Sequence, residues 1–129
     1  MIGYVTIGTS DLERTAAFFD ALLPDLGGAR AYSLDRMIAW GFGPSRPLLV
    51  ATFPSDGQPA RAGNGTMVAL MATDKAHVAR LHRRALDLGA TDAGVPSPVS
   101  GGFFGGYFRD PDGNKFCVFV MTSDPSPLG

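Results

Sequence analysis

The chain has 129 residues, of which 45% are hydrophobic and 18% charged, and its formal net charge is −1. This size predicts one domain, or two small modules that share a core. No basic run occurs in the sequence, which argues against nucleic acid and anionic membrane as partners, because both require a positive surface. The single cysteine, the absence of a signal peptide pattern and the lack of a long apolar stretch predict a cytoplasmic protein.

The first half of the chain predicts a strand, a helix and three further strands. Residues from Met1 to Thr9 alternate in the way that a strand does, and Ser10–Glu13 resembles a capping box at the start of a helix. Pro24 and the glycine pair after it end that helix. Three short apolar runs predict a meander of strands: Ala29–Ser33, Met37–Phe42 and Pro47–Phe53.

The second half repeats this order after a connector at 54–65, which is rich in proline and glycine. Thr66–Ala72 predicts a strand, and Thr73 and Asp74 cap a second helix that ends at Gly89. The proline- and glycine-rich segment Val95–Gly102 predicts a loop. We therefore expect module one at about 1–55, module two at 66–122, and a flexible tail at 123–129.

A β-hairpin closes the second half. Its turn is Asp110–Asn114, in which Pro111 presets the backbone and the following residues tolerate left-handed conformations. The flanking strands are Tyr107–Arg109 and Phe116–Met121. Both faces of the second strand are apolar, so we expect it to lie between a helix and a second buried surface.

The two halves align with a constant offset that places Tyr4 on Met67, Ser10 on Thr73 and Asp11 on Asp74. This predicts an α+β fold of two tandem βαβββ modules. Because each module has an apolar sheet face to bury, we expect the modules to form a curved mixed sheet around a cup, with the helices on its outer face.

The sequence resembles the vicinal-oxygen-chelate superfamily, which includes glyoxalase, bleomycin-resistance and extradiol dioxygenase proteins. Three stretches carry the resemblance: TIGTSDLERTAAFFDALL near the start, GNGTMVAL before the second helix, and FRDPDGNKFCVFV at the end. The resemblance extends over 1–122 as a single domain and implies the glyoxalase/bleomycin-resistance fold. It implies little about the reaction, because one fold supports many chemistries.

The resemblance also implies a divalent metal in the cup of catalytic members. The four corresponding positions in this sequence are Tyr4, Val50, Met67 and Cys117. A hard divalent ion prefers imidazole and carboxylate ligands, and this set offers a phenol, an isopropyl group, a thioether and one thiol. We therefore expect no metal and no other cofactor. The only histidines, His77 and His82, are five residues apart on the second helix, and we expect both on the solvated surface.

Strand alternation predicts an apolar and sulfur-rich lining for the cup. Two interpretations remain open for it: a packed core, or a pocket for a flat or greasy small molecule. Cys117 as a buried, unreactive thiol is favoured over a nucleophile, because no histidine is expected beside it. The glycine-rich segment 100–106 predicts either a flexible rim over the cup or an ordinary connector. The candidate ligand-binding residues are Tyr4, Thr6, Trp40, Val50, Met67, Tyr107, Cys117 and Phe119.

Three hypotheses about function follow. The first is a metal-free binding protein, forming a homodimer, that holds a small apolar or aromatic molecule in the cup. The second is a lyase or isomerase that uses Tyr4, Cys117 or an atypical metal site. The third is an interaction protein whose cup is filled. Metal-dependent glyoxalase or dioxygenase activity is disfavoured because the positions that would bind the metal carry the wrong side chains.

Overall fold

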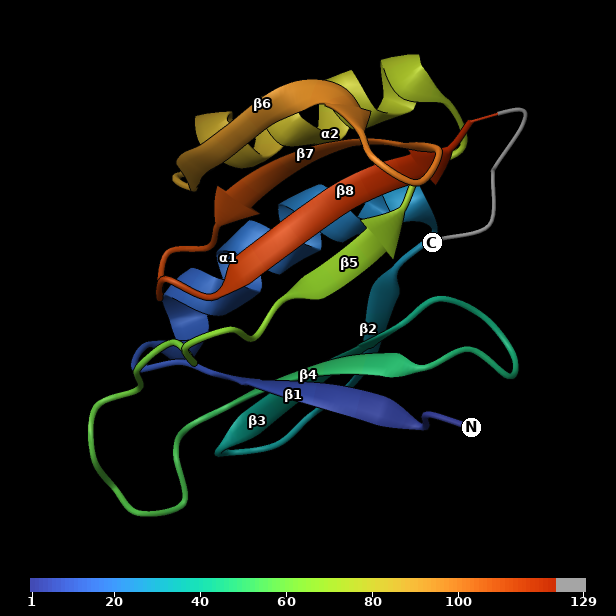
Figure 1. Cartoon of the computed structure of the whole chain (residues 1–129). Helices are drawn as coiled ribbons and strands as arrows, with labels where there is room; N and C mark the ends of the chain where they lie inside the picture. The colour runs from blue at the N-terminus through green and yellow to red at the C-terminus, as the bar shows by residue number, and fades with distance from the viewer. Residues whose placement is uncertain (123–129) are drawn as a thin grey trace.

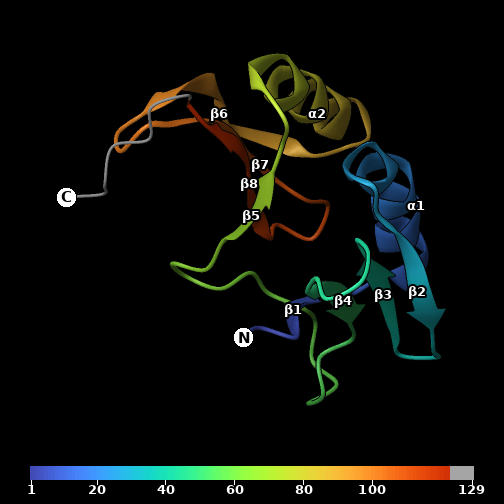
Figure 2. The ribbon, with the colours of Figure 1, turned by 90° about the vertical axis from the view of Figure 1, so that its right-hand side faces the viewer.

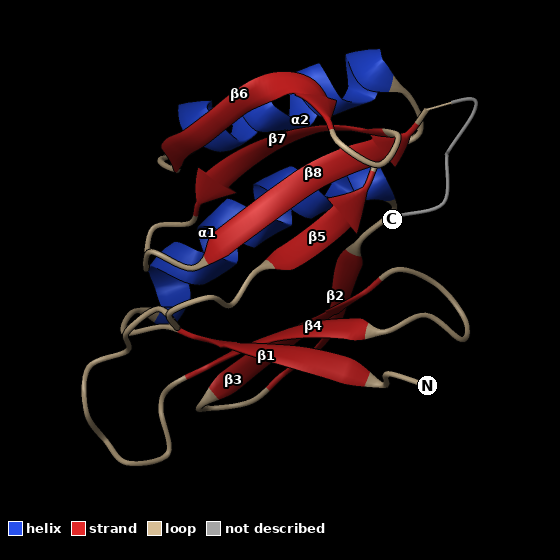
Figure 3. Ribbon diagram, viewed as in Figure 1, coloured by secondary structure: helices blue, strands red, loops and turns tan. Residues whose placement is uncertain are grey.

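The computed structural model describes residues 1–122, and the tail expected at 123–129 lies outside the described residues. Each half of this region contains one α-helix and four strands (Figures 1 and 3). The first half comprises β1 (Tyr4–Gly8), α1 (Leu12–Leu22), the 3-10 helix η1 (Leu23–Leu26), β2 (Ala29–Ser33), β3 (Met37–Gly41) and β4 (Leu48–Thr52). The second half comprises β5 (Val68–Met71), α2 (Lys75–Asp87), β6 (Thr91–Val99), β7 (Phe103–Arg109) and β8 (Lys115–Met121).

The strands form two four-stranded mixed sheets with equivalent orders. The first sheet runs β1-β4-β3-β2 and the second β5-β8-β7-β6. In each sheet the first strand of the module lies parallel to the last, and the remaining neighbours are antiparallel. The α+β class and the tandem βαβββ modules are confirmed, with the strands divided between two sheets that no hydrogen-bonded ladder joins.

Each sheet has one face covered by helices and one face free of them. Both helices lie in the angle between the two sheets (Figure 2). We call the opposite surfaces the helix-free faces. Within residues 1–122, no helix has the length and apolar character needed to cross a membrane.

A single hydrophobic cluster fills the space between the helices and the sheets. Phe19 of α1 is fully buried, and its ring centroid lies 5.2 Å from that of Trp40 and 5.5 Å from that of Phe116 on the second sheet. The helix of the first module therefore packs against strands of both modules. Burial of such large aromatic side chains removes much apolar surface from water and joins the modules into one unit.

Trp40 belongs to this core, so its placement in the ligand cup was wrong. Its side chain is fully buried on the helix side of β3, and its indole N–H donates to Asp20 Oδ1 at 2.9 Å. Strand alternation shows which residues share a face, but it does not show which of the two faces the helices will cover. In β3, the contact between Trp40 and Phe19 of α1 determines which face is covered.

Both α-helices begin at an aspartate at equivalent positions of the repeat. The side chain of Asp11 accepts from the backbone N–H of Arg14, and that of Asp74 accepts from the N–H of His77. The N-cap expected at Ser10 is thus one residue too early. Its hydroxyl accepts instead from the N–H of Ala60 in the connector, at 2.8 Å.

The segment expected as a loop at Val95–Gly102 is mostly strand. β6 covers Thr91–Val99 and pairs with β7, with register shifts near Gly94. Its two prolines are tolerated because β6 is an edge strand, where a missing N–H leaves no ladder bond unmade. The glycine-rich segment 100–106 forms the tight β6–β7 connection, in which Gly101 and Gly102 have φ values of 85° and 84°, and the start of β7. The rim interpretation is therefore wrong for most of that segment.

The predicted hairpin turn joins the end of the chain to its beginning. Asp112 Oδ1 accepts from the backbone N–H of Ser10 at 3.0 Å and from the guanidinium of Arg14 at 2.6 Å. Asn114 Nδ2 donates to the carbonyl of Gly8 at 2.9 Å. The turn is therefore a connection between the second module and the β1–α1 junction of the first.

The two histidines are buried, so their expected position on the solvated surface was wrong. His77 is 4% exposed and His82 is 5% exposed. The expected divergence of their rings is confirmed, because His77 contacts Asp25 of the first module whereas His82 contacts Asp92 and Tyr107. Both sides of α2 pack against other elements, so a ring on either side is covered.

His77 forms a second connection between the modules. Its Nδ1 accepts from the backbone N–H of Thr73 at 3.0 Å, which leaves Nε2 to donate to the carbonyl of Asp25 at 3.0 Å. Arg80 donates to the carboxylate of the same aspartate at 2.9 Å. These bonds tie the N-terminal turn of α2 to the 3-10 helix of the first module.

Replacing His77 with alanine is expected to lower the free energy of unfolding by about 1–3 kcal/mol, because a buried N–H and a carbonyl lose their partner. Chemical denaturation monitored by circular dichroism measures this change. The matched control is Arg83→Ala on the same helix, an exposed residue without a side-chain hydrogen bond to residues 1–122. Its unfolding free energy should change by less than about 0.5 kcal/mol. Equal effects of the two substitutions would contradict this role for His77.

Candidate functional site

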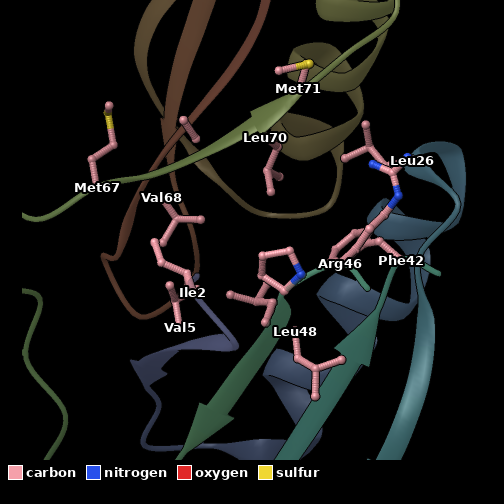
Figure 4. Close-up of a pocket in the computed structure, with 13 residues that line it drawn as sticks. Ile2, Val5, Leu26, Phe42, Arg46, Leu48, Met67, Val68, Leu70 and Met71 are labelled. Atoms are coloured by element: carbon pink, nitrogen blue, oxygen red, sulfur yellow. The ribbon is translucent and has the colours of Figure 1, made fainter. Parts of the chain in front are cut away.

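An apolar cleft lies where the two modules meet, between strands β1 and β4 of the first sheet and strand β5 of the second. Its volume is about 600 Å³, within the usual range for small-molecule sites. We refer to this space as the cleft (Figure 4). It is lined by Ile2, Val5, Leu26, Phe42, Arg46, Pro47, Leu48, Leu49, Met67, Val68, Ala69, Leu70 and Met71.

The cleft exists because β1 and β5 are edge strands that do not pair with each other. β1 pairs only with β4, and β5 pairs only with β8. Side chains from the two edges therefore border an open space, and Leu26 of η1 closes its inner end together with Phe42 (Figure 4). The aliphatic and thioether side chains of this wall suit a greasy ligand, and methionines adapt to irregular shapes.

Arg46 is the only charged residue among those that line the cleft. It follows a turn between β3 and β4 in which its backbone N–H donates to Gly43 O at 3.4 Å. Figure 4 shows its side chain at the end of the cleft formed by Leu26 and Phe42, whereas Ile2 and Met67 lie toward the other end. The cleft thus has one polar end and one apolar end.

Most of the predicted ligand-binding residues lie on the helix-free faces, but the structure does not bring them together in one cavity. Tyr4, Thr6 and Val50 are on the first sheet, with Thr6 directly paired with Val50. Tyr107, Cys117 and Phe119 are on the second sheet, where Tyr107 is directly opposite Cys117. Of the eight predicted residues, Met67 alone lines the cleft.

The side chains around Cys117 form a small polar and aromatic group on the second sheet. Lys115 Nζ lies 5.3 Å from the centre of the Tyr107 ring, and the Phe119 ring lies 5.4 Å from that of Phe103. Cys117 is only 6% exposed, and burial raises the pKa of its thiol above the ordinary value. Burial likewise raises the pKa of Tyr107. Neither group is activated toward nucleophilic or basic chemistry.

The four positions that correspond to the family's metal ligands do not suit a metal. Tyr4 and Val50 belong to the first sheet, whereas Met67 precedes β5 and Cys117 lies on β8 of the second. Only the Cys117 thiol is a credible ligand for a transition metal, and a single ligand does not hold one. Across residues 1–122, no three histidine, cysteine, aspartate or glutamate residues are grouped so that they could hold a metal ion.

Sequence reasoning missed most of the cleft lining because it assigned the site to a single set of alternating strand residues. Val5, Val68 and Leu70 have the opposite alternation and pack partly against the core. Arg46 is not among the residues that the sequence predicted for the site. The position of its turn next to the unpaired edges follows from the strand order, which a single sequence does not show.

Comparisons with known proteins agree with this architecture. A family model described as a glyoxalase-like domain matches residues 4–119. The crystal structure of a glyoxalase/bleomycin resistance protein from Albidiferax ferrireducens T118 superposes with a TM-score of 0.85 at 30% sequence identity, covering 94% of this chain and 98% of that one. A search of curated proteins gave no significant match.

Two more distant structures share the fold. A glyoxalase-related enzyme from Fulvimarina pelagi has a TM-score of 0.77 at 21% identity, covering 100% of this chain and 97% of that one. Lactoylglutathione lyase from Agrobacterium tumefaciens has a TM-score of 0.70 at 22% identity, covering 93% of this chain and 92% of that one. At such identities the likeness concerns the fold alone.

Cys117 is expected to react with iodoacetamide at neutral pH at least about tenfold more slowly in the folded protein than in the unfolded chain, because burial lowers both its access and its thiolate fraction. Mass spectrometry of timed samples measures the rate. The double variant Cys117→Ser, Val95→Cys supplies a matched control, since Val95 is 65% exposed. Labelling of the wild type as fast as that of the control would show that Cys117 is activated.

Proposed function

The chain belongs to the glyoxalase-like domain family, and within that family we propose that it is a binding protein that holds a small apolar or aromatic molecule without a metal ion. The observation that carries this proposal is the cleft, whose lining is apolar except for Arg46. Transfer of apolar ligand surface from water into such a wall is favourable by roughly 25 cal/mol per Å² before the costs of binding are subtracted.

The alternatives have less support from the geometry. A lyase or isomerase that used Tyr4 or Cys117 would not use the cleft, because neither residue lines it. Burial raises the pKa of the Cys117 thiol, and this effect outweighs the opposite effects of Tyr107 and Lys115. An interaction protein with a filled interior is disfavoured because the space between β1 and β5 is open.

The proposal includes a homodimer. The helix-free faces and adjoining strand edges carry large exposed apolar side chains, among them Tyr4 at 58%, Met67 at 44% and Met71 at 65% exposed. Large exposed apolar side chains that gather on one side of a protein are typical of protein–protein contacts. We propose a second copy as the occupant; the helix-free faces of one chain do not face each other, so they leave each other uncovered (Figure 2).

Naphthol and decanol are expected to raise the melting temperature of the wild-type protein and to bind in isothermal titration calorimetry, with or without EDTA. Met71→Glu should weaken their binding by at least about tenfold, because it places a charge on the apolar wall. Val95→Glu is the matched control, since Val95 is equally exposed and lies outside the cleft. Binding that survives Met71→Glu unchanged, or that EDTA abolishes, would refute the proposed site.

Sedimentation velocity is expected to show a dimer for the wild type and a shift toward monomer for Tyr4→Glu, because a carboxylate on an apolar interface is costly to desolvate. Val95→Glu should remain dimeric. A monomeric wild type would overturn the dimer without affecting the cleft. The same measurement on Met71→Glu separates a loss of assembly from a loss of the ligand site.

A further inference from the structure

Six of the nine arginines have a side-chain partner within residues 1–122, whereas Arg46, Arg61 and Arg83 have none there. Arg14, Arg30 and Arg80 donate to aspartate carboxylates, and others donate to backbone carbonyls. Arg46 makes no side-chain hydrogen bond or ion pair with any of residues 1–122, and it alone brings a charge to the cleft wall. Its guanidinium therefore has its donors available at the polar end of the cleft.

The backbone holds Arg46 at this place. The turn before it contains Gly43 with φ of 117° and Ser45 with φ of 60°, a left-handed value that is uncommon outside glycine. Pro47, which also lines the cleft, follows directly and leads into β4. The side chain thus begins at the rim of the cleft from a turn of defined conformation, which reduces the freedom it would lose on binding.

The distribution of charge along the cleft indicates the chemistry of its occupant. One end has a guanidinium beside Leu26 and Phe42, and the rest of the wall is aliphatic or thioether (Figure 4). A guanidinium pairs best with a planar oxyanion, which accepts two parallel N–H bonds. No second cation lines the cleft, so a head group of one negative charge fits better than a doubly charged phosphate.

We propose that the ligand is an organic carboxylate with an apolar body, whose head group pairs with Arg46 and whose body lies along β5 toward Met67. This inference rests on the proposed function, since it names the ligand class of the same cleft. Arg46 is an exposed residue at the rim of the cleft, so the pair is partly solvated and its strength depends on the salt concentration.

Matched acid and alcohol pairs test this proposal: decanoate against decanol, and naphthoate against naphthol. At pH 7 and low salt, the wild type is expected to bind each acid up to about fivefold more tightly than its alcohol, the usual range for an ion pair with an exposed side chain. Arg46→Gln should abolish this preference, because it removes the cation and so weakens the acids much more than the alcohols. Arg46→Lys should retain part of it, because the charge remains and the planar fork is lost.

Arg61→Gln is the matched control, because Arg61 is exposed, has no side-chain partner within residues 1–122 and lies outside the cleft. It should keep the full preference for acids. Raising the salt concentration should weaken the binding of the acids but not that of the alcohols, because salt screens the interaction between the guanidinium and the carboxylate. Circular dichroism of each variant confirms that it is folded.

The results that would contradict the carboxylate ligand differ from those that would contradict the proposed function. Equal affinities of the wild type for acids and alcohols, or equal losses in Arg46→Gln and Arg61→Gln, would overturn the carboxylate proposal and leave the cleft as a site for neutral apolar molecules. Absence of binding by both members of both pairs would overturn the proposed function as well. Tighter binding of decyl phosphate than of decanoate would replace the carboxylate by a phosphate head group and refute the proposal in its stated form.

Discussion

The way in which the two modules are joined determines the rest of the structure. The core aromatic Phe19 contacts both sheets, the closing turn bonds to the β1–α1 junction through Asp112 and Asn114, and His77 ties α2 to the first module. All of these contacts lie on the helix side or at the ends of the strands. None of them pairs the edge of β1 with the edge of β5, so the modules are held together while their edges remain apart.

The cleft is therefore a consequence of how the two modules pack, because the edges of β1 and β5 remain unpaired with each other. An unpaired edge exposes backbone donors and acceptors, and proteins usually cover or block such edges. Here the edges face a space bordered by Val5, Val68 and Leu70, whose side chains also contact the core. Rigid core packing therefore supports one wall of the cleft, which favours a site that is already formed before a ligand enters.

Much of the fold follows from local patterns, and the site does not. The repeat, the two helices and the closing hairpin depend on short-range signals, and the structure confirms them, although the N-cap of the first helix is Asp11 and not Ser10. The strand β6 was missed because Pro96 and Pro98 argue against a strand unless its position at a sheet edge is known. The burial of His77 and the position of Arg46 depend on contacts between modules, which no local pattern encodes.

Two observations favour an apolar ligand over a metal ion: the side chains at the four positions that correspond to metal ligands, and the apolar side chains of the cleft. Without imidazole and carboxylate donors at Tyr4, Val50, Met67 and Cys117, these four positions cannot hold a hard divalent ion that would orient a substrate. The polar contact available to a ligand lies instead at Arg46, at the end of the cleft formed by Leu26 and Phe42. Met67 belongs to both sets, because it is one of the four positions that correspond to metal ligands and it also lines the cleft. A thioether is a poor ligand for a hard ion and an adaptable apolar group, so this side chain suits a greasy molecule better than an ion.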